Sequence, residues 1–340
     1  MAPTTVLITG ANRGLGKGLL ERYLSQPNHT VVAAVRDPSH STSQALSSIP
    51  KADDSKLVVV KYDAGVEQDA HDVAETLQKT HGIDKLDVVI ANAAIAKGFV
   101  PIKEAKRSDV LEHVNVNVLG VLSLFQATRA LLERAAADAS PGEKPVFAII
   151  GTVAGSMGGM MDIPNAVYGA SKVMAHWYGL RLHKEEEWLS TLVIHPGWVQ
   201  TEMGNFAAGL LGVSEAPVTV DDSVNGMFSI LTDKDSKEKY GGKLVVTAFT
   251  THRTTIQNNR KISQKKTTIE HHAVHPVRRL LRHFHPHRGT QDADHINLTA
   301  HVKKSSALSV CSGVTCKPGQ GCKDDSTGGG VYAFVTNHIG

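Results

Sequence analysis

The sequence predicts an α/β protein with a doubly wound, seven-stranded parallel sheet and helices on both faces. Two observations support this fold class. Short apolar runs alternate with helical patterns from residue 4 to residue 247, and continuous Val, Ile and Leu strands are typical of a parallel sheet covered on both sides. A glycine-rich turn also follows the first strand directly, where such folds bind their ligand.

Each strand is recognised as a short run rich in β-branched residues, from TTVLIT at the first to KLVVT at the last. The strands are expected at 4–9, 30–35, 57–61, 86–91, 145–150, 192–195 and 243–247. The first helix is indicated by leucines at 15, 19, 20 and 24, a spacing of three and four residues that places them on one helix face. Further helices are expected at 66–80, 110–137, 165–188 and 220–231.

The chain has 340 residues, of which 41% are hydrophobic and 20% charged, so it can bury a sizeable core. We find no apolar run of the ~18 residues that a membrane span needs, and the N-terminus lacks the pattern of a secretory signal. Residues 1–248 contain no cysteine, as a reducing compartment permits. We therefore expect a cytoplasmic protein without a membrane span.

Residues 249–340 differ in character from the rest of the chain. They hold 13 Lys and Arg against 5 Asp and Glu, together with 10 of the 18 histidines and all three cysteines. We therefore divide the chain into an α/β domain, 1–248, and a basic, His-rich tail, 249–340. Disorder or an error in the gene model is favoured for the tail over a basic tether to an anionic partner, and no nucleic acid partner is expected.

The glycine-rich turn TGANRGLG at 9–16 predicts a dinucleotide site. Glycines at 10, 14 and 16 let the backbone turn tightly and approach a pyrophosphate, and the following helix N-terminus offers free N–H groups to the anion. The alternative is an ordinary connection between a strand and a helix. The position of this turn at the start of an alternating α/β chain favours the interpretation as a dinucleotide site.

Two arginines indicate which dinucleotide is bound. Arg13 lies in the glycine turn and Arg36 follows the second strand, so both could bind the 2′-phosphate of NADP. The alternative is that both are solvated surface charges. Asp37 argues the other way, because an acidic residue at this strand end binds the ribose hydroxyl of NAD. We predict NADP(H).

Tyr168 and Lys172 lie four residues apart in YGASK and so share a helix face. A phenol has an ordinary pKa of about 10, and a nearby ammonium lowers it by stabilising the phenolate. The pair therefore predicts an acid or base that works near neutral pH. A surface pair is the alternative, but the segment follows the fifth strand, whose carboxyl end faces the ligand crevice.

At this point the chain resembles the short-chain dehydrogenase/reductase family over about residues 4–248. The resemblance rests on TGANRGLG, on NAA at 92–94, on NVLG around Asn117, on YGASK and on HPGWVQTEM at 195–203. Within the family it is most similar to fungal ketoreductases of the norsolorinic acid type and to sniffer-type carbonyl reductases. The resemblance implies a Rossmann-type fold and carbonyl reduction.

The resemblance also implies roles for single residues. Tyr168 would donate a proton to the carbonyl oxygen while NADPH supplies hydride to the carbon, and Lys172 would hold the nicotinamide ribose. Asn117 would bind a water in a proton relay, unless it is simply a packing amide of the helix. The cofactor would contact a set of residues along the crevice: Gly10, Asn12, Arg13, Gly14, Leu15, Gly16, Arg36, Asp63, Asn92, Tyr168, Lys172, Val199 and Thr201.

Three of these positions carry specific expectations. Asp63 would accept a hydrogen bond from the adenine amino group, Asn92 would brace the strand beside the cofactor, and Thr201 would bond the nicotinamide amide. Asn92 and Thr201 could otherwise be simple turn residues. The family's usual glycine in the NAA segment is absent here.

The hydroxyl that polarises the carbonyl departs from the family pattern. The family usually has a serine after the fifth strand, and alignment on the following Val-Ala-Gly places Thr152 there. Threonine keeps the hydroxyl donor and adds a methyl group that restricts its χ1 rotamer. Ser156 is a second, less favoured candidate.

The segment after Met203 suggests an apolar lid over the substrate, with Phe206, Leu210 and Leu211. Further pocket walls are expected at Met157, Met160, Met161 and Trp198, although ordinary core packing would explain any single one of them. We therefore predict reduction of a hydrophobic ketone, with aromatic polyketide ketones as a candidate class. The alternatives are an alcohol dehydrogenase running oxidatively and a cofactor-binding regulator.

Two expectations concern other partners. The cysteines at 311, 316 and 322 lack the spacing of a zinc site, so no metal is expected. A homo-oligomer is possible through the helices at 110–137 and 165–188, which are usual dimer surfaces in the family.

Overall fold

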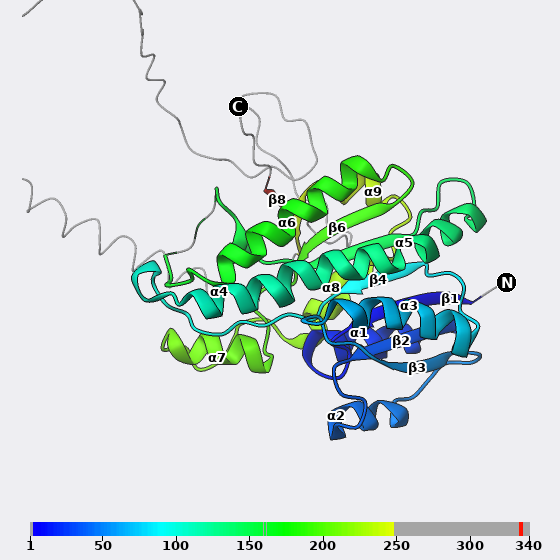
Figure 1. Ribbon diagram of the computed structural model, residues 1–340, viewed down its shortest axis with the longest axis horizontal. Coiled ribbons are helices and arrows are strands. Elements are labelled where there is room, and N and C mark those ends of the chain that lie inside the picture. The colour runs from blue at the N-terminus through cyan, green and yellow to red at the C-terminus, as the bar shows by residue number, and fades with distance from the viewer. Residues whose placement is uncertain (1–2, 159, 161, 248–332, 336–340) are drawn as a thin grey trace, which may run out of the picture. The chain divides into compact units, whose positions relative to one another are not determined.

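The computed structural model describes residues 3–158, 160, 162–247 and 333–335. Its strands form one sheet in the order β3-β2-β1-β4-β5-β6-β7-β8 (Figure 1). The strands are β1 Thr4–Thr9, β2 His29–Val35, β3 Lys56–Lys61, β4 Val88–Ala91, β5 Val146–Ile150, β6 Ser190–His195, β7 Leu244–Val246 and β8 Ala333–Val335. The first seven pair in parallel, which confirms the predicted fold class.

The eighth strand was not expected from the sequence. It comes from the segment assigned to the tail and pairs antiparallel with β7 at the edge of the sheet. Strand β8 belongs to the same compact unit as the seven parallel strands. The other predictions for the tail, including those on its cysteines, lie outside the described residues.

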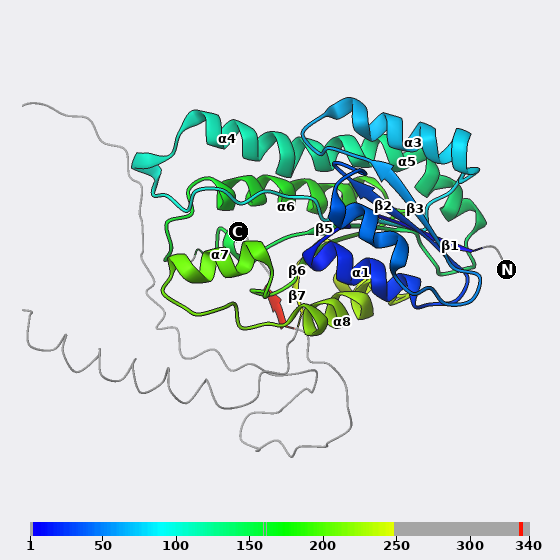
Figure 2. The ribbon, with the colours of Figure 1, turned by 90° about the horizontal axis from the view of Figure 1, so that it is seen from below.

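The helices are α1 Gly14–Leu24, α2 Ser41–Gln44, α3 Glu67–His81, α4 Arg107–Val114, α5 Gly120–Asp138, α6 Tyr168–Glu185, α7 Glu202–Leu210, α8 Val220–Leu231 and α9 Ser236–Tyr240. A π-helical turn, Asn115–Leu119, joins α4 to α5 into one long helix. Helices α3, α4, α5 and α6 lie on one side of the sheet, and α1 and α8 lie on the other (Figure 2).

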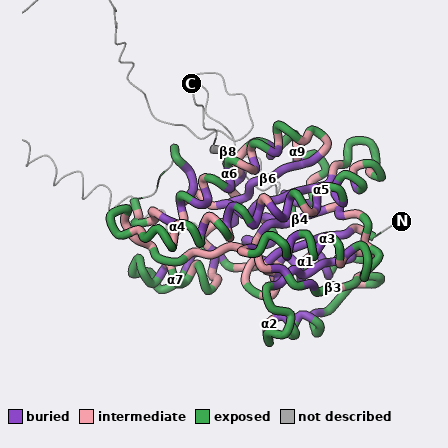
Figure 3. Tube along the Cα trace, viewed as in Figure 1, coloured by how far each residue is buried: buried purple, intermediate pink, exposed green. Residues whose placement is uncertain are grey.

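Alternation along the strands divides the core between these two faces. In β1, Val6 and Ile8 pack with α1 and α8, whereas Leu7 packs with α3 and α5 on the other side. All three side chains are fully buried. Figure 3 shows the buried strands between exposed outer helix faces. This two-sided burial is why the strands read as continuous apolar runs.

The long helix Arg107–Asp138 passes a length and composition test for a membrane span, with 44% of the tested window buried. Its apolar face packs in the core against the sheet, through residues that include Leu124, Phe125 and Leu132. The helix also carries the buried polar residues Asn117 and Thr128. These features are those of a core helix.

Three short helices were missed. Helix α7 lies in the glycine-rich segment that the sequence analysis assigned to a lid, and it begins where the Thr201 hydroxyl accepts a hydrogen bond from Gly204 N at 3.1 Å. Helices α2 and α9 are too short for a clear periodic pattern. Helix α8 has its predicted bounds, and the ends of the other long helices differ from the predicted ends by a few residues.

Candidate active site

The candidate site lies at the carboxyl ends of the parallel strands. Strand β1 has β2 on one side and β4 on the other, so the chain reverses its order across the sheet between β1 and β4. Loops that follow strands on either side of such a switch point flank a crevice. The glycine turn follows β1, and the segments with Asn92, Thr152 and Thr201 follow β4, β5 and β6.

The glycine turn has the backbone that its sequence suggested. Gly10 and Gly14 have φ values of +64° and +53°, a region that favours glycine. A Cβ atom on Gly16 would lie 2.3 Å from the Gly10 carbonyl oxygen and 2.6 Å from Asn92 Nδ2. The turn therefore needs glycine at position 16, and this close packing fits the cradle of a dinucleotide pyrophosphate.

Asn92 braces this turn from the neighbouring strand. Its Nδ2 donates to the Thr9 carbonyl at 2.8 Å and to the Gly10 carbonyl at 3.3 Å. In return, Thr9 Oγ1 accepts from the backbone N–H groups of Asn92 and Ala93 at 3.0 and 2.9 Å. The side chain therefore has the bracing position that the resemblance implied.

A Gly16→Ala variant is expected to weaken dinucleotide binding by more than ~10-fold, about 1.4 kcal/mol, because the added methyl group forces the turn to move. The control is Gly209→Ala, where an added Cβ meets nothing within 4 Å. Fluorescence titration with NADPH, together with a thermal melt, measures both variants. Equal affinity in Gly16→Ala and wild type would contradict the role of the turn.

The residues near the second strand differ in how they are engaged. Arg36 is exposed, whereas Asp37 accepts hydrogen bonds from Ser39 N at 2.8 Å and Ser39 Oγ at 2.6 Å. These bonds to Ser39 hold the pKa of Asp37 below its usual value. Arg13 forms an ion pair with Glu202 of α7, and both side chains are mostly exposed. The structure therefore does not show the side chains of Arg13 and Arg36 converging on one phosphate site.

The remaining predicted cofactor residues follow the carboxyl ends of strands β1, β3 and β6. Thr201 borders the glycine turn, since a Cβ on Gly14 would lie 3.3 Å from Thr201 Cγ2. Asp63 follows β3 and accepts from Gly65 N at 2.9 Å. Asn12 in the glycine turn donates to Thr42 Oγ1 at 2.7 Å. Val199 forms a parallel bridge with Val218 beside Thr201.

Tyr168, Lys172 and Thr152 gather after β5. Tyr168 begins α6, and Lys172 one turn later has its Nζ 5.9 Å from the Tyr168 ring centroid. Lys172 Nζ donates to the Ile150 carbonyl at 2.9 Å. Thr152 forms a side-chain hydrogen bond with Tyr168, which lowers the phenol pKa. The alignment that chose Thr152 over Ser156 thus agrees with the contact that Tyr168 makes.

The pKa values differ from the sequence-based prediction. Desolvation raises the pKa of Tyr168 to about 12, more than the Thr152 bond lowers it, and Lys172 is not among the causes. Burial lowers the pKa of Lys172 itself to about 8. The i, i+4 spacing in the sequence could not reveal these pKa shifts, because they come from the burial of both side chains, which disfavours their charged forms. Tyr168 is therefore protonated near neutral pH, which is the state of a proton donor.

Asn117 lies in the π-helical turn, where such turns frequently mark functional sites. Its Nδ2 donates to the Ile95 carbonyl at 2.9 Å and to Ser171 Oγ at 3.0 Å, and its Oδ1 accepts from Ile95 N at 2.9 Å. Both amide hydrogens are used within the protein. These bonds hold the side chain against Ile95 and Ser171, and its part in a proton relay stays a prediction.

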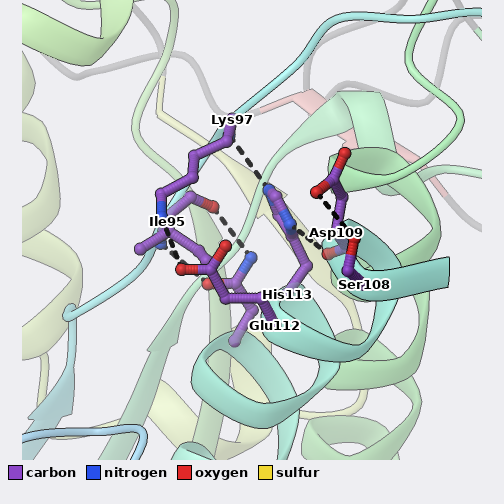
Figure 4. Close-up of polar contacts among 7 residues, drawn as sticks. Ile95, Lys97, Ser108, Asp109, Glu112 and His113 are labelled. Carbon is purple, nitrogen blue, oxygen red and sulfur yellow. Dashed lines mark hydrogen bonds and ion pairs between the residues drawn. The ribbon is translucent and has the colours of Figure 1, made fainter. Parts of the chain in front are cut away.

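His113 is a buried residue that the sequence analysis missed. One turn before Asn117, its Nε2 accepts from Lys97 N at 3.0 Å and its Nδ1 lies 2.7 Å from the Asp109 carbonyl (Figure 4). Lys97 also forms an ion pair with Glu112. His113 and Asn117 thus hold the loop after β4 at Lys97 and Ile95. The two side chains are recognised as important only in the structure, where both are buried on the same face of the helix.

Aromatic and apolar residues surround the tyrosine. Phe99, also missed from the sequence, has its ring centroid 6.5 Å from that of Tyr168 and 6.4 Å from that of Phe206. Five of the predicted pocket residues are exposed apolar side chains: Met157, Met160, Phe206, Leu210 and Leu211. Trp198 donates to the Gly204 carbonyl at 2.9 Å. The side chain of Met161 lies outside the described residues.

Within the part of the chain that the structure describes, no group of three His, Cys, Asp or Glu side chains could hold a metal ion. The chemistry available at the site is that of the phenol, the lysine ammonium and the threonine hydroxyl. Together with the braced glycine turn, they define an oxidoreductase with a dinucleotide-binding fold.

The chain belongs to the short-chain dehydrogenase family, whose sequence pattern it matches over residues 4–208. It is 43% identical over 246 residues to "Norsolorinic acid ketoreductase nor1" of Dothistroma septosporum, an alignment that covers 72% of this chain and 89% of that protein. It is therefore a short-chain reductase that acts on carbonyl groups, in a family that binds nicotinamide cofactors.

Solved structures agree with this assignment. The NADPH-bound carbonyl reductase from chicken fatty liver is 28% identical, with a TM-score of 0.62 over 72% of this chain and 97% of that one. The carbonyl reductase Sniffer of D. melanogaster shares the fold, with 20% identity and a TM-score of 0.61 over 73% and 97% of the two chains. The resemblance to ketoreductases of the norsolorinic acid type and to sniffer-type reductases is confirmed.

Proposed function

We propose that this chain is an NADPH-dependent ketoreductase of the cytoplasm that reduces a hydrophobic aromatic ketone, with Tyr168 as the proton donor. The observation that carries the proposal is the grouping of Tyr168, Lys172 and Thr152 after β5, at the same edge of the sheet as the braced glycine turn after β1. The substrate belongs to the class of polyketide ketones, and the physiological direction is reduction.

The mechanism follows from the protonation states of these groups. NADPH, held by the glycine turn and Lys172, would supply the hydride that reduces the carbonyl carbon. The Thr152 hydroxyl polarises the carbonyl oxygen, and Tyr168 donates its phenolic proton to that oxygen as negative charge develops there. Lys172, close to the ring, stabilises the phenolate that remains. Asn117 acts indirectly, because it holds Ile95 and Ser171 next to these groups.

The preference for NADPH rests on Arg36 and Asp37. Both hydrogen bonds from Ser39 go to Asp37 Oδ1 and tie that oxygen to its own turn. Arg36 is exposed beside it and suits the 2′-phosphate of NADP. Arg13 adds a second positive charge in the glycine turn, and its surface pair with Glu202 is weak enough to be exchanged for a phosphate.

The substrate class rests on the aromatic residues around Tyr168. Phe99 lies between Tyr168 and Phe206, and Phe206 is 53% exposed. Aromatic rings prefer offset or edge contacts with other rings, so this arrangement suits a flat aryl ketone. The name of the Dothistroma septosporum relative, a norsolorinic acid ketoreductase, supports the same class.

The test is a panel of ketones with NADPH consumption followed by absorbance. We expect polycyclic aryl ketones to have a kcat/KM at least ~10-fold above that of aliphatic ketones of similar polarity, about 1.4 kcal/mol. The physiological substrate need not be known, because the panel compares two classes of ketone. Equal or better turnover of aliphatic ketones would contradict the proposed aromatic substrate.

A Phe99→Ala variant is expected to raise KM for aryl ketones by about 5- to 10-fold, because a ring contact worth ~1 kcal/mol and its buried area are lost. The matched control is Ile102→Ala, close in sequence and 85% exposed. Initial rates with an aryl and an aliphatic ketone compare the two variants. An equal loss for both ketones would remove the aromatic contact from the explanation.

A further inference from the structure

We propose that His176, which the resemblance does not assign, is a positioning residue that fixes Thr152 against Tyr168. The inference rests on the proposed function, in which the Thr152 hydroxyl polarises the carbonyl. His176 is one turn after Lys172 and two turns after Tyr168 on α6, so the three side chains share one helix face. Two of them act on the substrate or cofactor, and the third acts through Thr152.

The contact is made to the backbone of Thr152. His176 Nε2 accepts a hydrogen bond from Thr152 N at 3.2 Å, and the side chain is only 7% exposed. Thr152 is also the N-cap of the short turn Val153–Gly155, where its Oγ1 accepts from Ala154 N at 3.2 Å. The histidine therefore holds the residue whose hydroxyl contacts Tyr168.

Two glycines make room for the imidazole ring. A Cβ on Gly151 would lie 2.7 Å from His176 Nε2, and a Cβ on Gly155 would lie 2.9 Å from His176 Cε1. The imidazole ring therefore fills the space that side chains at positions 151 and 155, on either side of Thr152, would otherwise occupy. A side chain of similar volume without an acceptor would fill this space and still leave Thr152 N without its partner.

The geometry requires one protonation state of the ring. Because Nε2 accepts from Thr152 N, it carries no proton, and the neutral ring must carry its proton on Nδ1. The surroundings favour this state, because burial and, to a smaller extent, the charges of Lys172 and His195 lower the pKa of His176 to about 4, whereas a backbone hydrogen bond with Gly155 acts in the opposite direction.

The experiment is a double-mutant cycle between His176→Leu and Thr152→Ala, with kcat and KM measured for an aryl ketone and affinity measured for NADPH. His176→Leu is expected to lower kcat by about 10²-fold, because small misplacements of catalytic groups have effects of this size. NADPH affinity is expected to stay within about twofold. In the Thr152→Ala background, His176→Leu is expected to have little further effect on kcat.

Two further variants keep the test decisive. His176→Gln offers an amide oxygen for Thr152 N and is expected to recover most of the lost kcat, whereas His183→Leu, on the same helix, is expected to leave kcat unchanged. Additive losses in the cycle, or a folded His176→Leu enzyme with wild-type kcat, would overturn the proposal. If Thr152→Ala alone keeps full activity, the proposed role of Thr152 fails instead.

The ring can also be observed without turnover. In ¹⁵N NMR of the full chain, His176 is expected to show a protonated Nδ1 and an unprotonated, hydrogen-bonded Nε2 across neutral pH. A ring with its proton on Nε2 would contradict the bond from Thr152 N, even where His176→Leu fails to fold.

Discussion

Replacing Tyr168 with phenylalanine is expected to lower kcat by about 10²- to 10⁴-fold, the range typical of a lost general acid. The phenol is protonated near neutral pH because desolvation raises its pKa to about 12. Phenylalanine keeps the ring and its contact with Phe99 but removes the proton. NADPH affinity is therefore expected to change little while turnover is lost.

The matched control is Tyr178→Phe on the same helix, whose ring lies against that of Trp177. This variant removes the same hydroxyl and is expected to retain wild-type kcat. Single-turnover measurements with saturating NADPH separate the chemical step from binding. If Tyr168→Phe turned over as fast as Tyr178→Phe, another group would have to supply the proton.

The second large effect is expected for Arg36→Asp. Hydrogen bonds to charged groups contribute ~1.5–3 kcal/mol, so the loss of the 2′-phosphate contact should weaken NADPH binding by about 10- to 100-fold. NADH lacks that phosphate and should be affected little. The ratio of the two dissociation constants, measured by fluorescence titration, reports the change directly.

Arg107→Asp serves as the control for charge alone, since Arg107 is exposed at the start of α4. Arg107→Asp changes the net charge by the same amount as Arg36→Asp, but Arg107 does not follow the second strand. An NADPH-to-NADH ratio that moved equally in both variants would indicate a general electrostatic effect. A ratio unchanged in Arg36→Asp would remove Arg36 from the phosphate site.

The sheet could be predicted because its signal is local and repeated. Each of the seven parallel strands is a short run rich in apolar residues, most of them buried outside the edge strand β3, and the helix expected at 220–231 is found with those bounds. Helix α7 was missed because its glycines weaken the periodic pattern, and its start depends on the Thr201 cap. Strand β8 was missed because three residues carry no period.

The sequence could predict those site residues that belong to a recognisable motif. Tyr168, Lys172 and the glycine turn are of this kind. His113 and His176 are not, because each acts by accepting a backbone N–H from a loop distant along the chain. The π-helical turn at Asn117 and the phenol pKa likewise depend on packing. A histidine on an amphipathic helix gives no sign in sequence of whether it is buried and bonded.

The central claim is that this chain transfers hydride from NADPH to a ketone carbon while Tyr168 supplies the proton. The most direct measurement uses NADPH that carries deuterium at the transferred position, an aryl ketone, and mass and NMR analysis of the alcohol formed. We predict deuterium on the carbinol carbon, formed by wild type and not by Tyr168→Phe. Alcohol without deuterium at that carbon, or equal deuterium transfer by both proteins, would contradict the account.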